Sequence, residues 1–272
     1  MIHSTAVIDE SAKISPDAVI GPGVVVGAYA IIGPKVEIGE GTEIAAHAVI
    51  KKNCIIGKHN KIHSFVSLAD DPQDIHYKGQ ESWLHIGDHN IIREFSTIHR
   101  SAKEGGITSV GDHNFIMCYA HIAHDCKIAN HVVFANNATV GGHVNVSDHA
   151  TLGGSALVHQ NCNVGAYSFV GGASALNQDV LPYVMVHGVP AHPIAVNIVG
   201  LRRHGFSKEV IDHIRSAYRI LFRRGYGLMN ARAELEKMAL ECKELELMLE
   251  AIDKSTRGIA MTTLGVDESV ED

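Results

Sequence analysis

A six-residue hydrophobic period runs through most of the chain. Starting at Ile8, every sixth residue up to Leu176 is aliphatic or Phe, apart from Asp74, Gln80 and Glu104. A glycine often follows the apolar residue, and a small or β-branched residue often stands two places before it. An α-helix cannot use this period, because about 3.6 residues per turn would spread these side chains over every face. Short strands separated by corners can use it, as in hexapeptide β-helices.

This period predicts a mainly β fold in which residues 1–190 form a parallel β-helix. Three hexapeptides would make one coil of about 18 residues, stacked on the next at about 4.8 Å, the usual spacing of paired strands. A β-sandwich is the alternative, but its turn signals would recur at irregular spacings of about 8–12 residues. The hexapeptide period therefore favours the stacked coil.

The last part of the chain changes to a helical pattern. From Ser207, which is placed to cap a helix, apolar residues up to Phe222 fall on one helical face. A second such run extends from Leu228 to Met248. We therefore expect residues 191–272 to form a small C-terminal α-helical subdomain with an acidic tail, frayed from about Asp253.

The hexapeptide period is interrupted twice, at about residues 69–85 and 99–109. A loop inserted between coils leaves the stack and is free to line a site. Tolerated surface insertion is the alternative interpretation of both segments. We expect the two loop insertions instead to mark the position of a functional site.

The segment AHIAHDC, residues 120–126, carries the strongest candidate chemistry. The period assigns Ile122 and Cys126 to the interior, which leaves His124 and Asp125 at a corner. Neighbouring residues at a corner can both face outward, so the aspartate could orient the imidazole beside it. An imidazole has a suitable basicity to take a hydroxyl proton near neutral pH.

The residues that stack on this corner are expected to leave space beside His124. One coil later the column of His124 holds Gly142, and two coils later it holds Gln160. His143 stands in the column of Asp125. A backbone N–H exposed at the glycine could face developing negative charge, as an oxyanion hole requires. No serine with a triad-like context is visible, so direct transfer is favoured over a covalent intermediate.

A zinc site is the alternative interpretation of these histidines. His121, His124 and His143 could converge, and some hexapeptide-repeat proteins carry zinc as carbonic anhydrases. The H-x-x-x-x-H pair expected of such a site is missing from AHIAHDC, so we expect no metal. The cysteines are odd in number and form no C-x-x-C pair, which indicates reduced thiols rather than disulfides or a zinc knuckle.

Composition and charge narrow the class further. An apolar content of 46% with 19% charged residues is typical of a globular protein with a sizeable core. A net charge of −7 argues against a nucleic-acid partner, which would require a basic surface. The first residues lack a basic segment followed by an apolar one, and no apolar run is long enough to span a membrane. We therefore expect a cytoplasmic protein with no integral membrane segment.

Several motifs together resemble those of one enzyme family. They are the QD and Y pieces of PQDIHYKG, TIHR at 97–100, AHIAHDC, ANNAT at 135–139, VHQ at 158–160, the G-x-P-A piece of GVPAHP, NI-x-GL-x-R at 197–203, and STRG. With them, nearly the whole chain resembles the UDP-N-acetylglucosamine O-acyltransferases that begin lipid A synthesis. The resemblance implies a left-handed coil and a homotrimer with sites between subunits. It also implies a (3-hydroxy)fatty acyl group donated as an acyl-carrier-protein thioester, a UDP-amino sugar as acceptor, and no cofactor.

The same resemblance implies roles for individual residues. His124 would act as general base on the sugar 3-hydroxyl with support from Asp125, and Gly142 would supply the oxyanion N–H. Gly172 matches an acyl-chain ruler position, where glycine leaves room for a longer chain. The residues expected around the sugar, the nucleotide or the acyl donor are Gln73, Asp74, His76, His99, His121, His143, Gln160, Asn197, Arg203 and His204.

Some positions around the nucleotide and the sugar depart from the family pattern. His76 stands where a lysine is usual, and His204 where a second arginine is expected. Val199 replaces a common glutamate and Pro190 a frequent histidine. Losing two fixed cations should weaken diphosphate binding. The acceptor could therefore be the 3-hydroxy sugar or its 3-amino analogue, and the chain could be a second copy with altered kinetics.

Two further alternatives belong to other classes of protein. A small-acyl, coenzyme A-dependent sugar N-acetyltransferase would share the coil, but it would hardly need a basic helical subdomain. A non-catalytic scaffold would share the coil without depending on His124.

One basic surface stands out in this acidic chain. Between residues 200 and 226, Glu209 and Asp212 are outnumbered by Arg202, Arg203, Lys208, Arg215, Arg219, Arg223 and Arg224. Such a patch would steer an acidic partner, and acyl carrier proteins are acidic as a class. A solvated helix face with ordinary charge is the alternative.

Overall fold

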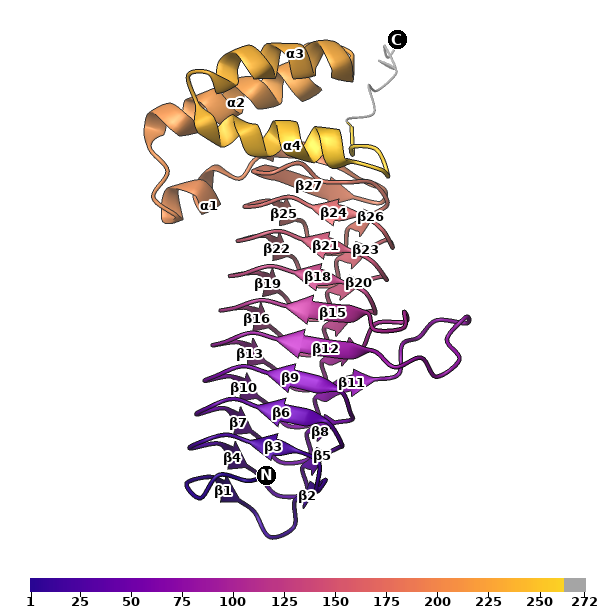
Figure 1. The fold of residues 1–272 in the computed structure, drawn as a ribbon. Helices are drawn as coiled ribbons and strands as arrows, with labels where there is room; N and C mark the ends of the chain where they lie inside the picture. The colour runs from indigo at the N-terminus through magenta and orange to yellow at the C-terminus, as the bar shows by residue number, and fades with distance from the viewer. Residues whose placement is uncertain (262–272) are drawn as a thin grey trace, which may run out of the picture.

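The computed structural model describes residues 1–261, which form a long stack of short strands with helices at one end (Figure 1). Three sheets run along the stack and make the sides of a prism. All pairing between coils is parallel, and one antiparallel hairpin closes the stack within the described residues. The left-handed parallel β-helix confirms the stacked coil expected from the hexapeptide period and the hand implied by the family resemblance.

Each sheet takes about every third strand. The eleven-stranded sheet contains β1 (Val7–Ile8), β4 (Val25–Val26), β7 (Glu43–Ile44), β10 (Lys61–Ile62), β13 (Ile91–Ile92), β16 (Phe115–Ile116), β19 (Val133–Phe134), β22 (Thr151–Leu152), β25 (Phe169–Val170), β27 (Val184–Gly188) and β28 (Ala191–Val196). The nine-stranded sheet contains β2 (Lys13–Ile14), β5 (Ile31–Ile32), β8 (Val49–Ile50), β11 (Ser67–Asp70), β14 (Thr97–His99), β17 (His121–Ile122), β20 (Thr139–Val140), β23 (Leu157–Val158) and β26 (Ala175–Leu176). The eight-stranded sheet contains β3 (Val19–Ile20), β6 (Val36–Ile38), β9 (Cys54–Ile56), β12 (Trp83–Ile86), β15 (Ile107–Val110), β18 (Lys127–Ile128), β21 (Asn145–Val146) and β24 (Asn163–Val164).

The interior of the prism is built from the periodic apolar residues. Most strands have an outward residue followed by an inward one: in β13, Ile91 is exposed and Ile92 is fully buried. The residue two places before the inward one also faces the interior and is often small, as Ala120 is before Ile122. Fully burying such an aliphatic side chain contributes about 1.5–3 kcal/mol. A shift of register would expose the whole set, which explains why the period is so strict.

Most corners of the prism turn through a residue in the left-handed conformation. Asp125 and His143 both adopt a φ of 62° at such positions. We call the corner after the nine-stranded sheet corner I, the corner after the eight-stranded sheet corner II, and the corner after the eleven-stranded sheet corner III. Representative turns are His124–Asp125 and Gly142–His143 at corner I, Asn130–His131 and Asp148–His149 at corner II, and Asn136–Asn137 and Gly154–Ser155 at corner III.

Side chains at the corners stack on one another along the prism. At corner II, ring centroids lie 4.7 to 5.1 Å apart in a column formed by His59, His89, His113, His131 and His149. A similar column at corner III contains Tyr29, His47, Phe65, Phe95 and Tyr119. Six of the 19 histidines are therefore members of regular stacks, and corner I differs from both of these corners.

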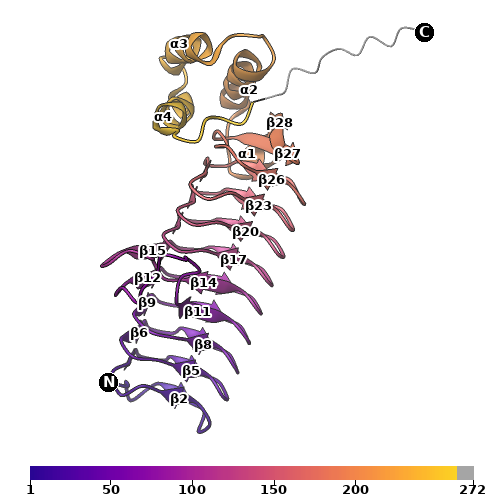
Figure 2. The ribbon, with the colours of Figure 1, turned by 90° about the vertical axis from the view of Figure 1, so that its right-hand side faces the viewer.

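The coils end in a hairpin and a helical cap. β27 pairs with β25 in parallel and with β28 in antiparallel fashion, so the hairpin spans the boundary expected between residues 190 and 191. It is followed by α1 (Ile198–Arg203), α2 (Lys208–Phe222), α3 (Leu228–Ala239), the 3-10 helix η1 (Lys243–Leu245) and α4 (Glu246–Lys254). Ser207 caps α2 as predicted, because its Oγ accepts a hydrogen bond from Val210 N at 3.2 Å. Figure 2 shows α2, α3 and α4 gathered beyond the hairpin.

The second predicted helical run is interrupted. Leu228–Met248 does not form one helix, because α3 ends at Ala239 and the chain turns at Leu240. Cys242 is extended, with a φ of −140°, before η1 and α4 begin. Within residues 1–261, no helix combines the length and the apolar character needed to cross a membrane.

The predicted fraying from Asp253 is wrong for the residues that the structure describes. Asp253 closes α4 against α3 through Arg232, with Nε to Oδ1 at 2.7 Å. The chain then returns to the coils, where Ala260 N donates to Asp179 O at 2.9 Å. The remainder of the predicted acidic tail, residues 262–272, lies outside the described part of the chain.

Candidate active site

Both interruptions of the hexapeptide period emerge at corner I. The first forms a projecting loop, residues 71–82, between β11 and β12 (Figure 1). The other, residues 100–106 between β14 and β15, is called here the second insertion. Strand pairing continues past both, since Lys61 pairs with Ile91 and Ile91 pairs with Phe115. The insertions thus add surface to one corner without breaking the stack.

His124 and Asp125 form a hydrogen-bonded pair at this corner. His124 Nδ1 lies 2.8 Å from Asp125 Oδ2. An ionised carboxylate can only accept, so Nδ1 carries the proton and Nε2 keeps a free lone pair. The imidazole is 12% exposed, which leaves it within reach of a ligand. The pair is therefore arranged as a base with an orienting carboxylate.

The Asp125 carboxylate is held by donors from the second insertion. Ser101 Oγ lies 2.5 Å from Asp125 Oδ1, and Ala102 N donates to Oδ2 at 3.1 Å. Burial alone would raise the pKa of Asp125, but the hydrogen bonds from Ser101, His124 and Ala102 outweigh it and hold that pKa below its ordinary value. Asp125 is consequently an anion at neutral pH.

Gly142 forms a notch against the imidazole. A Cβ at Gly142 would lie 2.7 Å from His124 Cε1 and 2.8 Å from Nε2, closer than side chains pack. Its carbonyl accepts from Asn161 N at 3.0 Å, whereas its N–H has no hydrogen-bond partner within residues 1–261. Pro16 and Pro34 occupy the same place in earlier coils, so the fold needs no N–H there. A ligand oxygen would satisfy this group.

His143 lies beside the pair. Its ring stands at 88° to that of His124 with centroids 5.3 Å apart, and its Nε2 lies 3.9 Å from Asp125 Oδ2. Burial lowers the pKa of His143 despite the attraction of Asp125, so its imidazole is neutral at pH 7. His124, Asp125 and His143 each have a possible ligand atom within 4.8 Å of those of the other two. This proximity is only the minimum that a metal site would require. His121, part of the zinc alternative, is not in this group.

Two more predicted residues, His99 and His121, lie on adjacent strands of the same side. His121 Nδ1 lies 2.7 Å from Thr97 Oγ1, and its ring meets that of His99 edge-on at 5.1 Å. Burial, together with repulsion from His99 and His124, lowers the pKa of His121 to about 4. Burial also lowers the pKa of His99, whose buried Nδ1 has no partner among the described residues. Both rings are therefore neutral hydrogen-bonding groups rather than cations.

The projecting loop contributes further predicted residues to corner I. The charge of Asp74 acts on His143 and raises its pKa, which partly opposes the larger lowering caused by burial. Asp74 Oδ1 also accepts from His76 N at 2.8 Å, which shapes the loop. The side chains of Gln73 and His76 are exposed, as is Gln160, two coils beyond His124. These residues are open to a ligand without being held in one position.

The predicted residues near the C-terminal cap lie at corner II instead. Asn197 caps α1: its Oδ1 accepts from the first turn at 3.1 Å, and its Nδ2 donates to Tyr167 O at 2.9 Å. His204 packs on the last ring of the histidine column, with its centroid 4.4 Å from that of His149. Arg203 is exposed beside it. A single chain therefore does not bring these residues together with His124.

Gly172 lies at corner III. It is exposed, and a Cβ there would meet Gly154 O at 3.3 Å. The predicted residues are thus divided among all three corners, with the His124–Asp125 pair at corner I.

Sequence analysis missed residues that support the site. Ser101 binds the Asp125 carboxylate, and Thr108 Oγ1 accepts from Asp125 N at 2.8 Å. Thr97 similarly orients His121. The only signal for Ser101 and Thr108 was their place in the second interruption, because the hexapeptide period does not tell which loop side chain returns to the stack.

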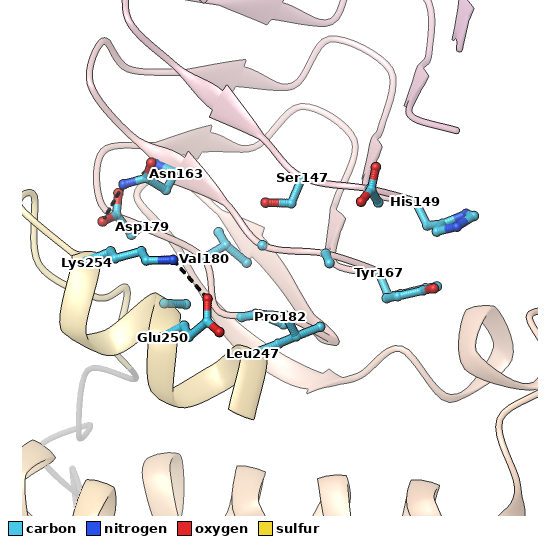
Figure 3. A pocket seen from close by; sticks show the side chains of 14 residues that line it. Ser147, His149, Asn163, Tyr167, Asp179, Val180, Pro182, Leu247, Glu250 and Lys254 are labelled. Carbon is cyan, nitrogen blue, oxygen red and sulfur yellow. Dashed lines mark hydrogen bonds and ion pairs between the residues drawn. The ribbon is translucent and has the colours of Figure 1, made fainter. Parts of the chain in front are cut away.

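A separate hollow of about 430 Å³ lies between the coils and α4 (Figure 3). Asp179 is held there by Asn163 at 2.7 and 3.0 Å, and Lys254 Nζ donates to Glu250 Oε2 at 2.8 Å. None of the residues predicted to be catalytic lines it. These polar groups already have partners in the protein, and the hollow lies where α4 meets the coil stack.

Family comparisons match both parts of the fold. Residues 179–260 match the family described as UDP N-acetylglucosamine O-acyltransferase, domain 2. Residues 107–142 match the bacterial transferase hexapeptide, and residues 1–98 match a GMPPB C-terminal domain. The last two matches cover coils, whereas the first covers the hairpin and the helical cap.

Individual relatives extend over most of the chain. The acyl-[acyl-carrier-protein]–UDP-N-acetylglucosamine O-acyltransferase of Halorhodospira halophila is 49% identical over 205 residues, 75% of this chain and 80% of the relative. Its counterpart in Syntrophobacter fumaroxidans is 52% identical over 209 residues, again 75% and 80%.

Solved structures show the same likeness. The UDP-N-acetylglucosamine acyltransferase of Francisella novicida has a TM-score of 0.81 and 42% identity, with both chains fully covered. The O-acyltransferase of Moraxella catarrhalis has a TM-score of 0.83 and 42% identity, covering 95% of this chain and 99% of its own. Because relatives about half identical to it span three quarters of the chain, and solved structures match nearly all of it, the chain belongs to the UDP-N-acetylglucosamine O-acyltransferase family.

Proposed function

We propose that the enzyme transfers a (3-hydroxy)fatty acyl group from acyl carrier protein to the 3-position of UDP-N-acetylglucosamine, the first step of lipid A biosynthesis. The observation that carries this proposal is the oriented His124–Asp125 pair beside Gly142, whose N–H has no hydrogen-bond partner within residues 1–261. The relatives bear names with the same donor and acceptor. The enzyme would work in the cytoplasm, where carrier-bound acyl groups and nucleotide sugars are made.

The arrangement at corner I supports a direct transfer. His124 Nε2 removes the proton from the sugar 3-hydroxyl, and the oxygen attacks the thioester carbonyl carbon. The negative charge that develops on the carbonyl oxygen is stabilised by the Gly142 N–H. The intermediate then collapses: the C–S bond breaks, the leaving thiolate takes the proton from the imidazolium, and the ester remains. Asp125 stays ionised and stabilises the imidazolium.

We further propose that the site is completed in a homotrimer. Arg203 and His204 lie at corner II and Gly172 at corner III, whereas His124 lies at corner I. Prisms packed side by side can set one corner against a different corner of the next copy. In this arrangement, residues implied in nucleotide and acyl-chain binding would reach the base of a neighbouring subunit.

The donor and the acceptor can be tested together. Purified protein would be given a panel of acyl-carrier thioesters, with acetyl-coenzyme A as the small-acyl donor, and either UDP-N-acetylglucosamine or its 3-amino analogue. We expect an ester of a long acyl group with the 3-hydroxy sugar, identified by product mass. Amide formation alone would redirect the proposal to the amino sugar, and acetyl transfer alone would overturn it.

The surface proposed for the carrier protein lies on α2. Arg219 and Arg223 are exposed there and, with Arg215, line a groove against β28. The Arg223 guanidinium lies 5.7 Å from the centroid of the Tyr218 ring and donates to Ile194 O at 3.3 Å. Arg223 is therefore anchored, while Arg219 is open to a partner.

Reversing both charges, Arg219→Glu with Arg223→Glu, should lower kcat/KM for the carrier-protein donor by roughly 10-fold at low salt. The loss should shrink as salt screens the surface, and an acyl-pantetheine donor should react as before. Initial rates at two salt concentrations provide the measurement. The matched control is Lys13→Glu with Lys61→Glu, which makes the same charge change on distant coils. Unchanged rates at low salt would reject the docking surface.

A further inference from the structure

We propose that Ser101, in the second insertion, is a positioning residue that fixes the Asp125 carboxylate for its work on His124. This inference rests on the proposed role of His124 as general base. It gives the second insertion a chemical role beyond adding surface to corner I.

The direction of the Ser101 hydroxyl proton follows from its neighbours. Ser101 Oγ accepts a hydrogen bond from Lys103 N at 3.0 Å. Its own proton is therefore free to point to Asp125 Oδ1, at 2.5 Å. Ser101 is fully buried, so bulk water does not compete for this contact. A hydroxyl donating to a carboxylate at this distance is a short, charge-assisted hydrogen bond.

The carboxylate is engaged on both oxygens. Ser101 occupies Oδ1, while Oδ2 receives Ala102 N at 3.1 Å and His124 Nδ1 at 2.8 Å. With both oxygens held, the carboxylate cannot rotate away from the imidazole. Because Ser101 and Ala102 also donate to the carboxylate, its negative charge is partly neutralised by them. The charge therefore stabilises a protonated His124 less strongly than a carboxylate without these donors would.

The backbone around this contact departs from the coil pattern. At the next coil of corner I, His143 N donates to the carbonyl of the preceding coil, His124 O, at 3.0 Å. Among the described residues, Asp125 N has no such carbonyl partner and donates instead to Thr108 Oγ1 at 2.8 Å. Gly106 leaves space on the other side, because a Cβ there would overlap Ser101 Oγ. The second insertion is thus shaped around the serine hydroxyl and Asp125.

Removing the hydroxyl should change the pH dependence as well as the rate. In Ser101→Ala, Asp125 loses its donor to Oδ1, so its negative charge is less neutralised and attracts a proton on His124 more strongly. The protonated imidazole is then more stable, and the free base is available only at higher pH. The acidic limb of the kcat/KM profile should therefore move to higher pH. The plateau should fall roughly 10-fold, the scale of one hydrogen bond to a charged group.

The experiment measures kcat/KM against pH for the full-length enzyme and its variants. Ser101→Ala is expected to shift the limb and to lower kcat, with the sugar KM nearly unchanged. Ser101→Thr keeps the hydroxyl and should restore the limb to its original pH. An unmoved limb and an unchanged plateau in Ser101→Ala would refute the positioning role.

Ser82→Ala is the matched control for packing. Ser82 is also fully buried, and its Oγ donates to the carbonyl oxygen of Ser101 without touching Asp125. It should leave the acidic limb where it is. An equal shift in Ser82→Ala would assign the effect to the stability of the second insertion and overturn the inference. Failure of the general-base proposal is distinguishable, because His124→Ala would then keep its turnover.

Discussion

Replacing His124 with alanine should lower kcat at least ~100-fold, the usual scale for a positioned general base. In the proposed mechanism the ring accepts the sugar proton, and no other imidazole at corner I is held by a carboxylate at 2.8 Å within the described residues. The sugar KM should change by only a few fold, because the residues proposed to bind the substrates are spread over three corners. Product mass against time, with the carrier-protein thioester as donor, provides the measurement.

A matched control separates this loss from a general effect of removing an imidazole. His131→Ala deletes an exposed ring from the column at corner II, and it should retain turnover. The melting temperatures of both variants should stay close to that of the parent. Near-normal turnover in His124→Ala would exclude direct general-base transfer at corner I.

Gly142→Ala should reduce kcat by a similar factor, roughly 100-fold, through steric displacement. The new methyl group would lie 2.7 Å from His124 Cε1 and 2.8 Å from Nε2, so the ring or the backbone must move. Movement of the ring disturbs its hydrogen bond to Asp125, and movement of the backbone changes the direction of the Gly142 N–H. A misplacement of about 1 Å in a catalytic group costs up to about 100-fold in rate. Steady-state kinetics with saturating sugar would report the loss in kcat.

Gly154→Ala tests whether any methyl group at a corner glycine has this effect. Gly154 occupies the same place in a coil at corner III, where the nearest atom to a new Cβ would be Asn136 O at 3.6 Å. This ordinary contact distance requires no adjustment. Activity should stay within about two-fold of the parent, since no catalytic atom moves. A full rate in Gly142→Ala would contradict the steric argument and the oxyanion assignment together.

The coil could be predicted from sequence because one physical demand repeats along it. Each inward residue, such as Ile92 or Ile122, faces the same narrow interior, so the period survives wherever the coil does. The cap was harder to predict. Apolar spacing marked α2 correctly, but it joined α3 to α4 because spacing does not detect the extended Cys242 between them.

Prediction of the candidate site was limited in a similar way. Counting in steps of 18 placed Gly142 over His124, because stacking is periodic. It gave no information on the second insertion, where the contact between Ser101 and Asp125 depends on loop conformation. Nor could a list of family positions reveal that Arg203 and Gly172 lie at corners other than that of His124.

The pairing of strands across each insertion has an evolutionary consequence. Ile91 pairs with Lys61 on one side and with Phe115 on the other, as strands do in uninterrupted coils. The strand pairing therefore does not depend on the length of the loop inserted at corner I. Mutations that lengthen, shorten or recompose these loops can therefore accumulate with little penalty in folding. Ligand preference can diverge between descendants of one ancestor while the scaffold that they inherit remains the same.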